Sequence, residues 1–203
     1  MTGLHRWVGL PVAAVLLVCG VVGVQLANGG GEYEPLRPAD PCAARTVTSQ
    51  AQGIDALTER LVLLGIDGAA CRLHVSREAF TLELAQTDDP TDAQIDALRG
   101  GLKSAVMRMK ADGTLPPASA LVDESLDSTD LNDLVKRLIR ALPDSSIDAA
   151  LKTDDVLTRA VDDLDLRTVL ANLDDQDALE QQIEVAVTGA VKASLEARIR
   201  DLV

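Results

Sequence analysis

The sequence predicts an all-α fold: a single N-terminal transmembrane helix, a flexible linker and a compact multi-helix extracytoplasmic bundle. Apolar residues recur at the three- and four-residue spacing of a helix face through much of the chain beyond residue 53. Aromatic residues are nearly absent, since Trp7, Tyr33 and Phe80 are the whole set. Sandwiches and barrels rely on aromatic and β-branched side chains, so an all-β fold is disfavoured. A hydrophobic content of 47% excludes disordered and collagen-like classes.

The chain is strongly acidic. It carries 32 acidic and 19 basic residues, a formal net charge of −13. Residues 114–203 hold 19 of the acidic and 9 of the basic side chains, so most of the excess lies there. Nucleic-acid affinity comes largely from Lys and Arg on phosphates, and single-strand binders also stack bases on exposed rings. We therefore expect no nucleic-acid partner.

Residues 7–27 are almost wholly apolar, with Gln25 the main exception. About 20 such residues in a helix cover a hydrocarbon core of about 30 Å. Secretory signal peptides have shorter apolar regions, and Gln25 stands where their cleavage site wants a small residue. We therefore expect an uncleaved signal anchor at 7–27, with cleavage left open. Cys19 lacks the lipobox pattern because Val18 precedes it, so it is expected to be a small apolar residue of the span.

Charges around this span predict its orientation. Arg6 precedes it, whereas Glu32, Glu34 and Asp40 follow it along with Arg37. The positive-inside rule then makes residues 1–6 cytoplasmic and places the body outside the cell membrane, as in a single-pass protein. Residues 28–52 open with Asn-Gly-Gly-Gly, carry three prolines and are predicted to be a flexible linker before an acidic all-α domain at 53–203. The bias of 14 Arg over 5 Lys is typical of a GC-rich bacterial genome.

Two cysteines, Cys42 and Cys71, lie outside the span. An even pair in an exported domain predicts one disulfide, closing about 30 residues. The alternative is a metal site made of both cysteines and His74, but a structural zinc site takes four ligands and no fourth is evident. We expect the disulfide, no metal and no cofactor.

Capping signals divide the first part of the domain into helices. A stripe beginning at Ile54 predicts a first helix that Gly65 and Gly68 end, and Ser76 is a candidate N-cap for a second. Thr91 opens a capping box with Gln94, starting a helix that continues to Asp112. Gly113 is predicted to follow the C-terminus of this helix, and Pro116-Pro117 to prevent its continuation. The Gly100-Gly101 pair within the helix is interpreted as a close crossing with another helix.

Residues 114–203, the acidic part of the chain, are predicted to form further helices. An amphipathic helix is predicted over 131–142, stopped by Pro143, with a short turn at 147–151. Short helices follow at 156–164 and 166–173, and a long final helix at 179–202 has a broad apolar face. Asp155, Asp165 and Asp177 each begin one of these stripes, as N-terminal carboxylates do.

One segment resembles a known motif. Residues 68–77 read Gly-Ala-Ala-Cys-Arg-Leu-His-Val-Ser-Arg and resemble the Ala-Ala-x-x-Leu-Gly-Val-Ser-Arg turn of bacterial helix-turn-helix DNA-binding proteins. The resemblance implies an alternative function, that of a membrane-anchored regulator with a cytoplasmic DNA-binding segment. It departs from the motif at His74, which replaces the turn glycine, and Glu78 and Glu83 fall in the would-be recognition helix. A disulfide at Cys71 and an outside location would exclude it.

Catalytic signatures are missing from the sequence. It contains no G-x-S-x-G, Walker A, H-E-x-x-H or G-x-G-x-x-G motif, and His74 is the lone histidine of the expected body. We expect no enzyme and no catalytic residues. The clusters at 162–165 and 174–177 lack the glycine and twelfth-position glutamate of a calcium loop and are interpreted as helix caps, with cation binding left open.

Together these features predict a single-pass membrane protein with an exported acidic helical domain. Its function is predicted to be that of a non-catalytic protein-binding or scaffolding module of the bacterial envelope. Either a protein partner or a second copy would bind through the C-terminal helices.

Overall fold

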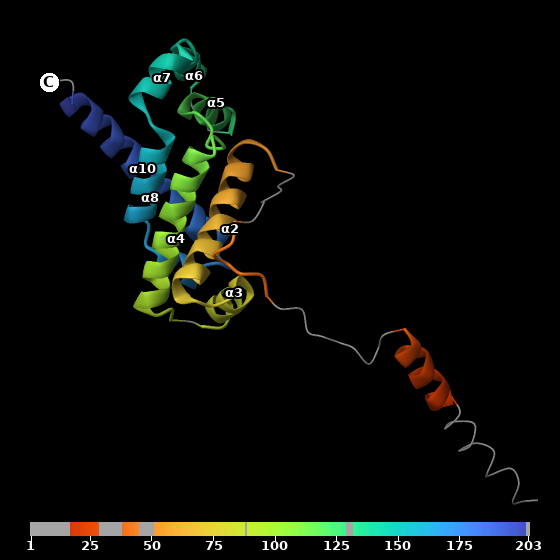
Figure 1. Cartoon of the computed structure of the whole chain (residues 1–203). Coiled ribbons are helices and arrows are strands. Elements are labelled where there is room, and N and C mark those ends of the chain that lie inside the picture. The colour runs from red at the N-terminus through yellow and green to blue at the C-terminus, as the bar shows by residue number, and fades with distance from the viewer. Residues whose placement is uncertain (1–16, 29–37, 45–50, 88, 129–131, 202–203) are drawn as a thin grey trace, which may run out of the picture. The chain divides into compact units, whose positions relative to one another are not determined.

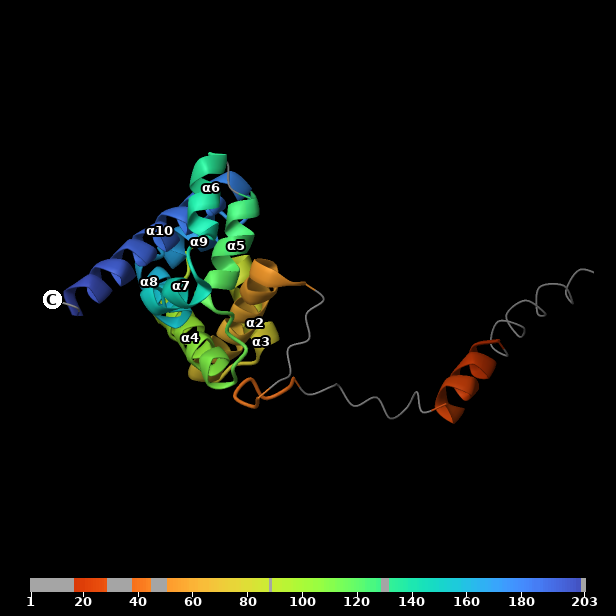
Figure 2. The same ribbon diagram turned by 90° about the horizontal axis from the view of Figure 1, so that it is seen from above.

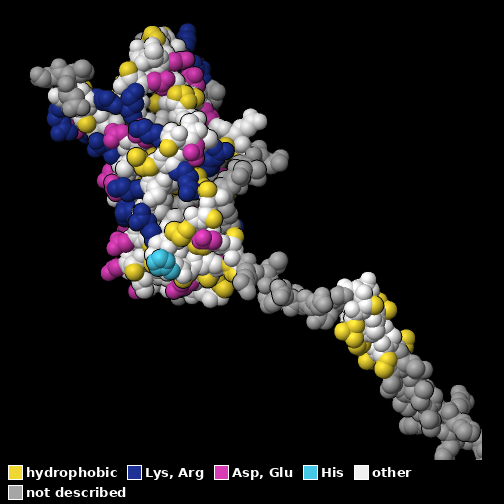
Figure 3. Space-filling model, in the orientation of Figure 1, with side chains coloured by type: hydrophobic (Ala, Val, Ile, Leu, Met, Phe, Trp, Pro, Cys, Tyr) yellow, Lys and Arg dark blue, Asp and Glu magenta, His cyan; other side chains and the backbone are white. Residues whose placement is uncertain are grey.

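The computed structural model describes residues 17–28, 38–44, 51–87, 89–128 and 132–201, in two units, 1–37 and 38–203 (Figure 1). In the first unit, residues 17–27 are helical and their side chains are exposed; Figure 3 shows no charged side chain on this helix. Among the described residues, no helix combines the length and apolar character that crossing a membrane requires. Residues 7–16 of the predicted anchor and the cytoplasmic segment 1–6 lie outside the described residues, as do 29–37 and 45–50 of the predicted linker.

The second unit is built from helices alone in the part that the structure describes, which confirms the all-α prediction. Its helices, in chain order, are α2 (Gly53–Leu73), α3 (Arg77–Gln86), α4 (Asp92–Ala111), α5 (Ala118–Ser128), α6 (Asp133–Arg140), α7 (Asp144–Ala150), α8 (Thr153–Asp163), α9 (Leu166–Ala171) and α10 (Gln176–Asp201).

The centre of the bundle is α4. It runs antiparallel to α2 on one side and packs against α8 on the other, and α10 in turn packs on α8 (Figures 1 and 2). The short helices α5, α6 and α7 gather at one end, and α3 lies at the opposite end (Figure 1). Arg99 of α4 ties this layer to α8 by donating hydrogen bonds to the carbonyl oxygens of Val161, Asp162 (2.8 Å) and Leu164 (3.1 Å), which satisfies carbonyls at the C-terminal end of that helix.

The prediction that Gly65 and Gly68 end the first helix is wrong, because α2 continues through both to Leu73. These glycines face the partner helix. A Cβ atom on Gly101 would lie 2.2 Å from the Gly65 carbonyl oxygen, and one on Gly68 would lie 3.0 Å from the Gly101 Cα. Close packing of α2 on α4 offsets the low helix propensity of glycine. The close crossing predicted at Gly100-Gly101 is thereby confirmed.

Most predicted helix caps are present. The Ser76 hydroxyl accepts a hydrogen bond from the Ala79 amide at 3.1 Å, and Thr91 forms the predicted capping box with Gln94. Gly113 has φ +66°, a conformation that suits glycine after a helix C-terminus. Asp165 accepts from two amides at the start of α9. The capping residues and the apolar periodicity indicate the same helices, which explains why the sequence predicts the positions of most helices.

Two boundaries differ from expectation. Residues 118–128 form α5, a helix that the sequence analysis did not predict. The compact unit begins at Pro38, because Cys42 is joined to Cys71 in the last turn of α2. Residues 38–44 therefore belong to the body, although they fall in the predicted linker. The interpreted helices at 131–142 and 147–151 correspond to α6 and α7.

Candidate functional site

An apolar cavity of about 530 Å³ lies in the described part of the body. It lies among α2, α5, α8 and α10, with Leu102 of α4 reaching its wall. Its aliphatic lining from α2 and α5 is Ile54, Leu57, Leu61, Val62, Ala118, Leu121, Val122 and Leu126. The aliphatic lining from the chain around α8 and from α10 is Leu151, Val156, Leu157, Ala160, Val161, Leu164, Ile183, Ala186, Val187 and Val191.

The way α10 packs explains why this cavity exists. Its buried residues are small: Ala186 and Ala190 are buried among the helices, and Ser194 is fully buried one turn further on. Small side chains let α10 approach α8 closely, and they turn the bulkier stripe of the same helix aside. Ile183 and Val187, which lie on that stripe, are 43% and 38% exposed and line the cavity. A sizeable aliphatic surface is therefore left unfilled beside α8.

The polar lining is sparse, and two of its members are satisfied within the protein. Thr58, Ser125 and Thr153 contribute the only hydroxyls among the described residues around the cavity. The Ser125 hydroxyl donates to the Leu121 carbonyl oxygen at 2.8 Å, and that of Thr153 donates to the Pro116 carbonyl oxygen at 2.9 Å. Neither a charged nor an aromatic side chain occurs in this described lining. The cavity thus suits an aliphatic group without polar atoms.

The wall formed by α5 is fixed by polar contacts at two points along the helix. The Glu124 carboxylate accepts hydrogen bonds from the Ile54 amide at the start of α2, with N···O distances of 2.9 and 3.0 Å. A negative group is favoured at this helix N-terminus. At the N-terminal end of α5, the Ser119 amide donates to Asp148 at 2.8 Å. Gly53 has φ +61° and leaves room that the Glu124 carboxylate fills. These contacts hold α5 over the cavity.

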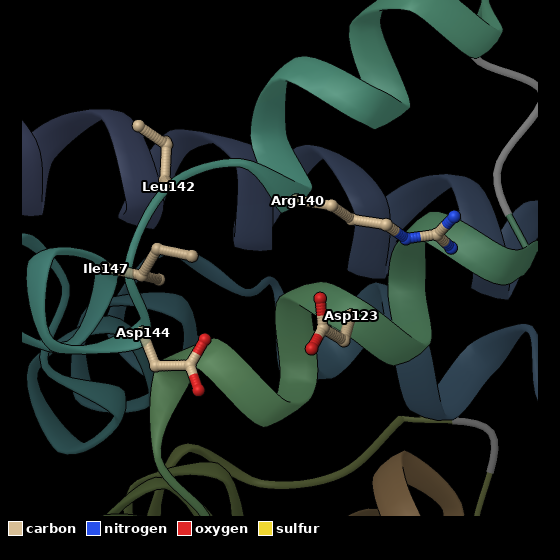
Figure 4. Close-up of a pocket in the computed structure, with 5 residues that line it drawn as sticks. All are labelled: Asp123, Arg140, Leu142, Asp144 and Ile147. Carbon is tan, nitrogen blue, oxygen red and sulfur yellow. The ribbon is translucent and has the colours of Figure 1, made fainter.

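A second hollow, of about 550 Å³, lies at the end of the bundle formed by α5, α6 and α7. Figure 4 shows Asp123 on α5 with Arg140 and Asp144 on either side, and the Arg140 side chain extends away from Asp144. All three side chains are exposed. The charged groups do not converge on a common point, so this hollow presents no arrangement for binding a single ion or reacting group.

The predicted cysteine pair is brought together. The Sγ atoms of Cys42 and Cys71 lie 2.03 Å apart, and their Cα atoms are 4.9 Å apart. The zinc alternative needed both cysteines as thiolate ligands, so it conflicts with this pairing. Within the described residues, no group of three His, Cys, Asp or Glu side chains could hold a metal ion.

The aspartate clusters serve the helices around them. Asp162 pairs with Lys103 of α4 at 2.8 Å, and Asp165 caps α9. Hydrogen bonds from the Thr168 hydroxyl and from backbone amides lower the pKa of Asp165. Asp175 accepts from the Ala178 amide at 3.1 Å, so α10 begins earlier than the predicted start at Asp177. Asp165 and Asp175 act as helix caps, as predicted, whereas the ion pair of Asp162 with Lys103 was not predicted from the sequence.

Asp155 gives a test of pH dependence. Its pKa is lowered, first by the hydrogen bond from Arg159 (Nε···Oδ2 3.0 Å) and further by Ser194 and the charge of Arg198. A carboxyl with a depressed pKa in the folded state stabilises the fold above its unfolded pKa of about 4, and that contribution is lost as the pH falls through the folded value. The pair is more than one-third exposed, so solvent screening keeps the effect below about 1 kcal/mol.

We therefore expect Asp155→Asn to lower the free energy of unfolding slightly at neutral pH and to have no effect once the pH is below the folded pKa. Urea unfolding across this pH range measures it. In the background Arg159→Gln, the Asp155→Asn difference should shrink because the main cause of the pKa shift is gone. An equal loss of stability at neutral and acid pH would assign the effect to packing instead.

The segment that resembles a helix-turn-helix forms the end of one helix, a short turn and the start of the next helix. α2 ends at Leu73, His74 takes the left-handed conformation (φ 56°, ψ 36°), and α3 begins after the cap Ser76. Arg77 is the one basic residue on α3, and it faces the buried Asp67 (3.7 Å) and Glu78 (3.5 Å). Glu83 is exposed on the same helix. The segment thus consists of two helices joined by a short turn, and the charge on α3 does not favour phosphates.

In comparisons with known proteins, no protein family model, curated protein or solved structure matches the chain.

Proposed function

We propose that this chain is a non-catalytic binding module of the bacterial envelope, anchored in the cell membrane by residues 7–27 and carrying its helical body outside. The observation that carries the proposal is the aliphatic cavity among α2, α5, α8 and α10. An unfilled apolar space of this size lies within the range of about 300–1,000 Å³ that ligand sites occupy. Two of the three hydroxyls described around it, those of Ser125 and Thr153, donate to backbone carbonyl oxygens, which supports binding rather than chemistry.

The Cys42–Cys71 pair supports the outside location, because disulfides persist in oxidising compartments and are rare in the cytosol. The long apolar stretch without charges and the single Arg6 before it support the anchor and its direction. Protein partners or a second copy of the chain have a further surface on α10, where Val185 and Ile199 are 68% and 62% exposed.

Thiol labelling of intact cells tests the location. In the variant Cys19→Ser, which removes the third cysteine, we expect a membrane-impermeant maleimide to label Cys42 and Cys71 only after an impermeant reductant is added. The covalent pair must be opened before either sulfur reacts. Labelling that needs cell lysis and no reductant would place the body in the cytoplasm and contradict the proposal. The double variant lacking both cysteines is the blank.

A second candidate function is DNA binding by α3 of a cytoplasmic body, and the turn at His74 between α2 and α3 favours it. It needs Cys42 and Cys71 reduced and the opposite topology. The same labelling experiment separates the two candidates. The acidic character of the body and the acidic residues on α3 support the envelope-binding module over this alternative.

A further inference from the structure

We propose that the cavity among α2, α5, α8 and α10 accommodates one acyl chain of a membrane lipid. The inference rests on the proposed function, because the body meets lipid only if it is tethered beside a bilayer. Fourteen residues, 28–41, lie between the end of the predicted span at Ala27 and the cross-link at Cys42, and they reach at most about 50 Å when fully extended. The body is thus confined to the neighbourhood of the membrane that holds its anchor.

The chemistry of the cavity selects an aliphatic chain. Its described lining is composed of Leu, Ile, Val and Ala with three hydroxyl residues, and it offers no ring to stack on and no charge to pair with. The hydroxyls of Ser125 and Thr153 already donate to backbone carbonyl oxygens. A ligand with polar atoms inside the cavity would leave them without partners, which is costly in an apolar environment. A lipid tail places only methylene groups there.

The size of the cavity disfavours a helix as its occupant. An α-helix is about 10–12 Å wide, so a volume of about 530 Å³ holds roughly one turn of it. One turn cannot present the several anchors by which a helix recognises a groove. An acyl chain is narrow and flexible, and it can follow the aliphatic surface from Leu57 and Val161 in the interior to the exposed Val62, Ile183 and Val187 at the opening.

Photo-crosslinking of the full chain tests the proposal. The protein is reconstituted into phosphatidylcholine nanodiscs that contain a small fraction of phosphatidylcholine with a diazirine in one acyl chain. After illumination, the modified peptides are mapped by mass spectrometry. We expect two sets of cross-links, one within residues 7–27 and one on α2 and α10 at the cavity wall. The first set serves as an internal standard for contact with the bilayer.

A matched pair of variants on α10 locates the second set. Val187 lines the cavity, whereas Val185, two residues away, is 68% exposed and does not line it. We expect Val187→Trp to abolish the cavity cross-links and Val185→Trp to leave them unchanged, with the span cross-links retained in both. Circular dichroism and the intact mass of the oxidised protein check that each variant keeps its helices and its disulfide.

Each other outcome overturns the inference in a distinguishable way. Span cross-links without cavity cross-links leave the anchor in place and refute the acyl-chain site; a second copy covering the cavity would give this result together with a dimer in sedimentation. Cavity cross-links that persist in Val187→Trp show that lipid lies on the surface of the body. Absence of both sets refutes the anchor, and with it the proposed function.

Discussion

Replacing Gly101 by alanine is expected to lower the free energy of unfolding by more than about 3 kcal/mol, at the upper end of overpacking effects. The added Cβ atom would lie 2.2 Å from the Gly65 carbonyl oxygen and 2.7 Å from the Ala69 backbone nitrogen. Both are backbone atoms of α2, so no side-chain rotation relieves the contact and the two helices must move apart. Ala69 and Ala70, which are fully buried in the same layer, would lose their close packing.

The adjacent glycine supplies the control. A Cβ on Gly100 meets the Arg72 guanidinium at 3.0–3.3 Å, which is the far end of a flexible side chain. Gly100→Ala should therefore change stability by no more than about 1 kcal/mol, because the higher helix propensity of alanine offsets the displaced Arg72 contacts. Denaturant unfolding of the two variants under the same conditions measures the difference. Equal stabilities would mean that α2 and α4 do not cross at Gly101.

The same glycines show what a sequence can and cannot predict. Gly100-Gly101 was interpreted as a close crossing because two adjacent glycines in a capped helix are costly without a compensating contact. Gly65 and Gly68 were interpreted as the end of a helix because glycine ends helices more often than it crosses them. The compensating contact comes from α4, 30 or more residues away in the chain. Local signals carry no information about such a partner.

Helix α5 was missed for a similar reason. Residues 118–128 follow two prolines and have few signals of their own, and the contacts that hold them are long-range: Glu124 with the start of α2, and Ser119 with Asp148. Conversely, Ser76, Thr91 and Asp165 were predicted as caps because capping depends on residues within one helical turn. Short-range polar chemistry is therefore predictable here, whereas long-range polar anchoring is not.

The cavity could not be predicted from composition or periodicity. The apolar stripe of the final helix, including Ile183 and Val187, reads as a buried face. The structure buries its alanine side, Ala186 and Ala190, and leaves the larger side chains beside an unfilled space. The available signal was the breadth of the apolar face, which exceeds what packing on one neighbour requires. The breadth of this face does not indicate whether the remaining apolar surface packs on another helix or binds a ligand.

The second large effect is expected at the disulfide. Removing it in the variant Cys42→Ser, Cys71→Ser should lower the free energy of unfolding by about 3–4 kcal/mol, the loop-closure value for residues 29 positions apart. The cross-link limits the unfolded chain, and its loss restores that freedom. Denaturant unfolding of the oxidised protein and of the variant measures this. Cys19→Ser is the control, because Cys19 is free and should leave the stability of the body unchanged.

The structure also predicts which part of the body loses its order when the Cys42–Cys71 disulfide is opened. Cys71 lies in the last turn of α2, whose packing on α4 through Gly65, Gly68 and Gly101 does not involve the sulfur. Opening the bond should therefore release residues 38–44 to proteolysis while the far-ultraviolet circular dichroism stays native below the unfolding transition. Loss of helix on reduction at low temperature would instead show that the bond is needed to form α2. Because disulfides persist mainly outside the cytosol, the full stability of the body is then available only in an oxidising compartment.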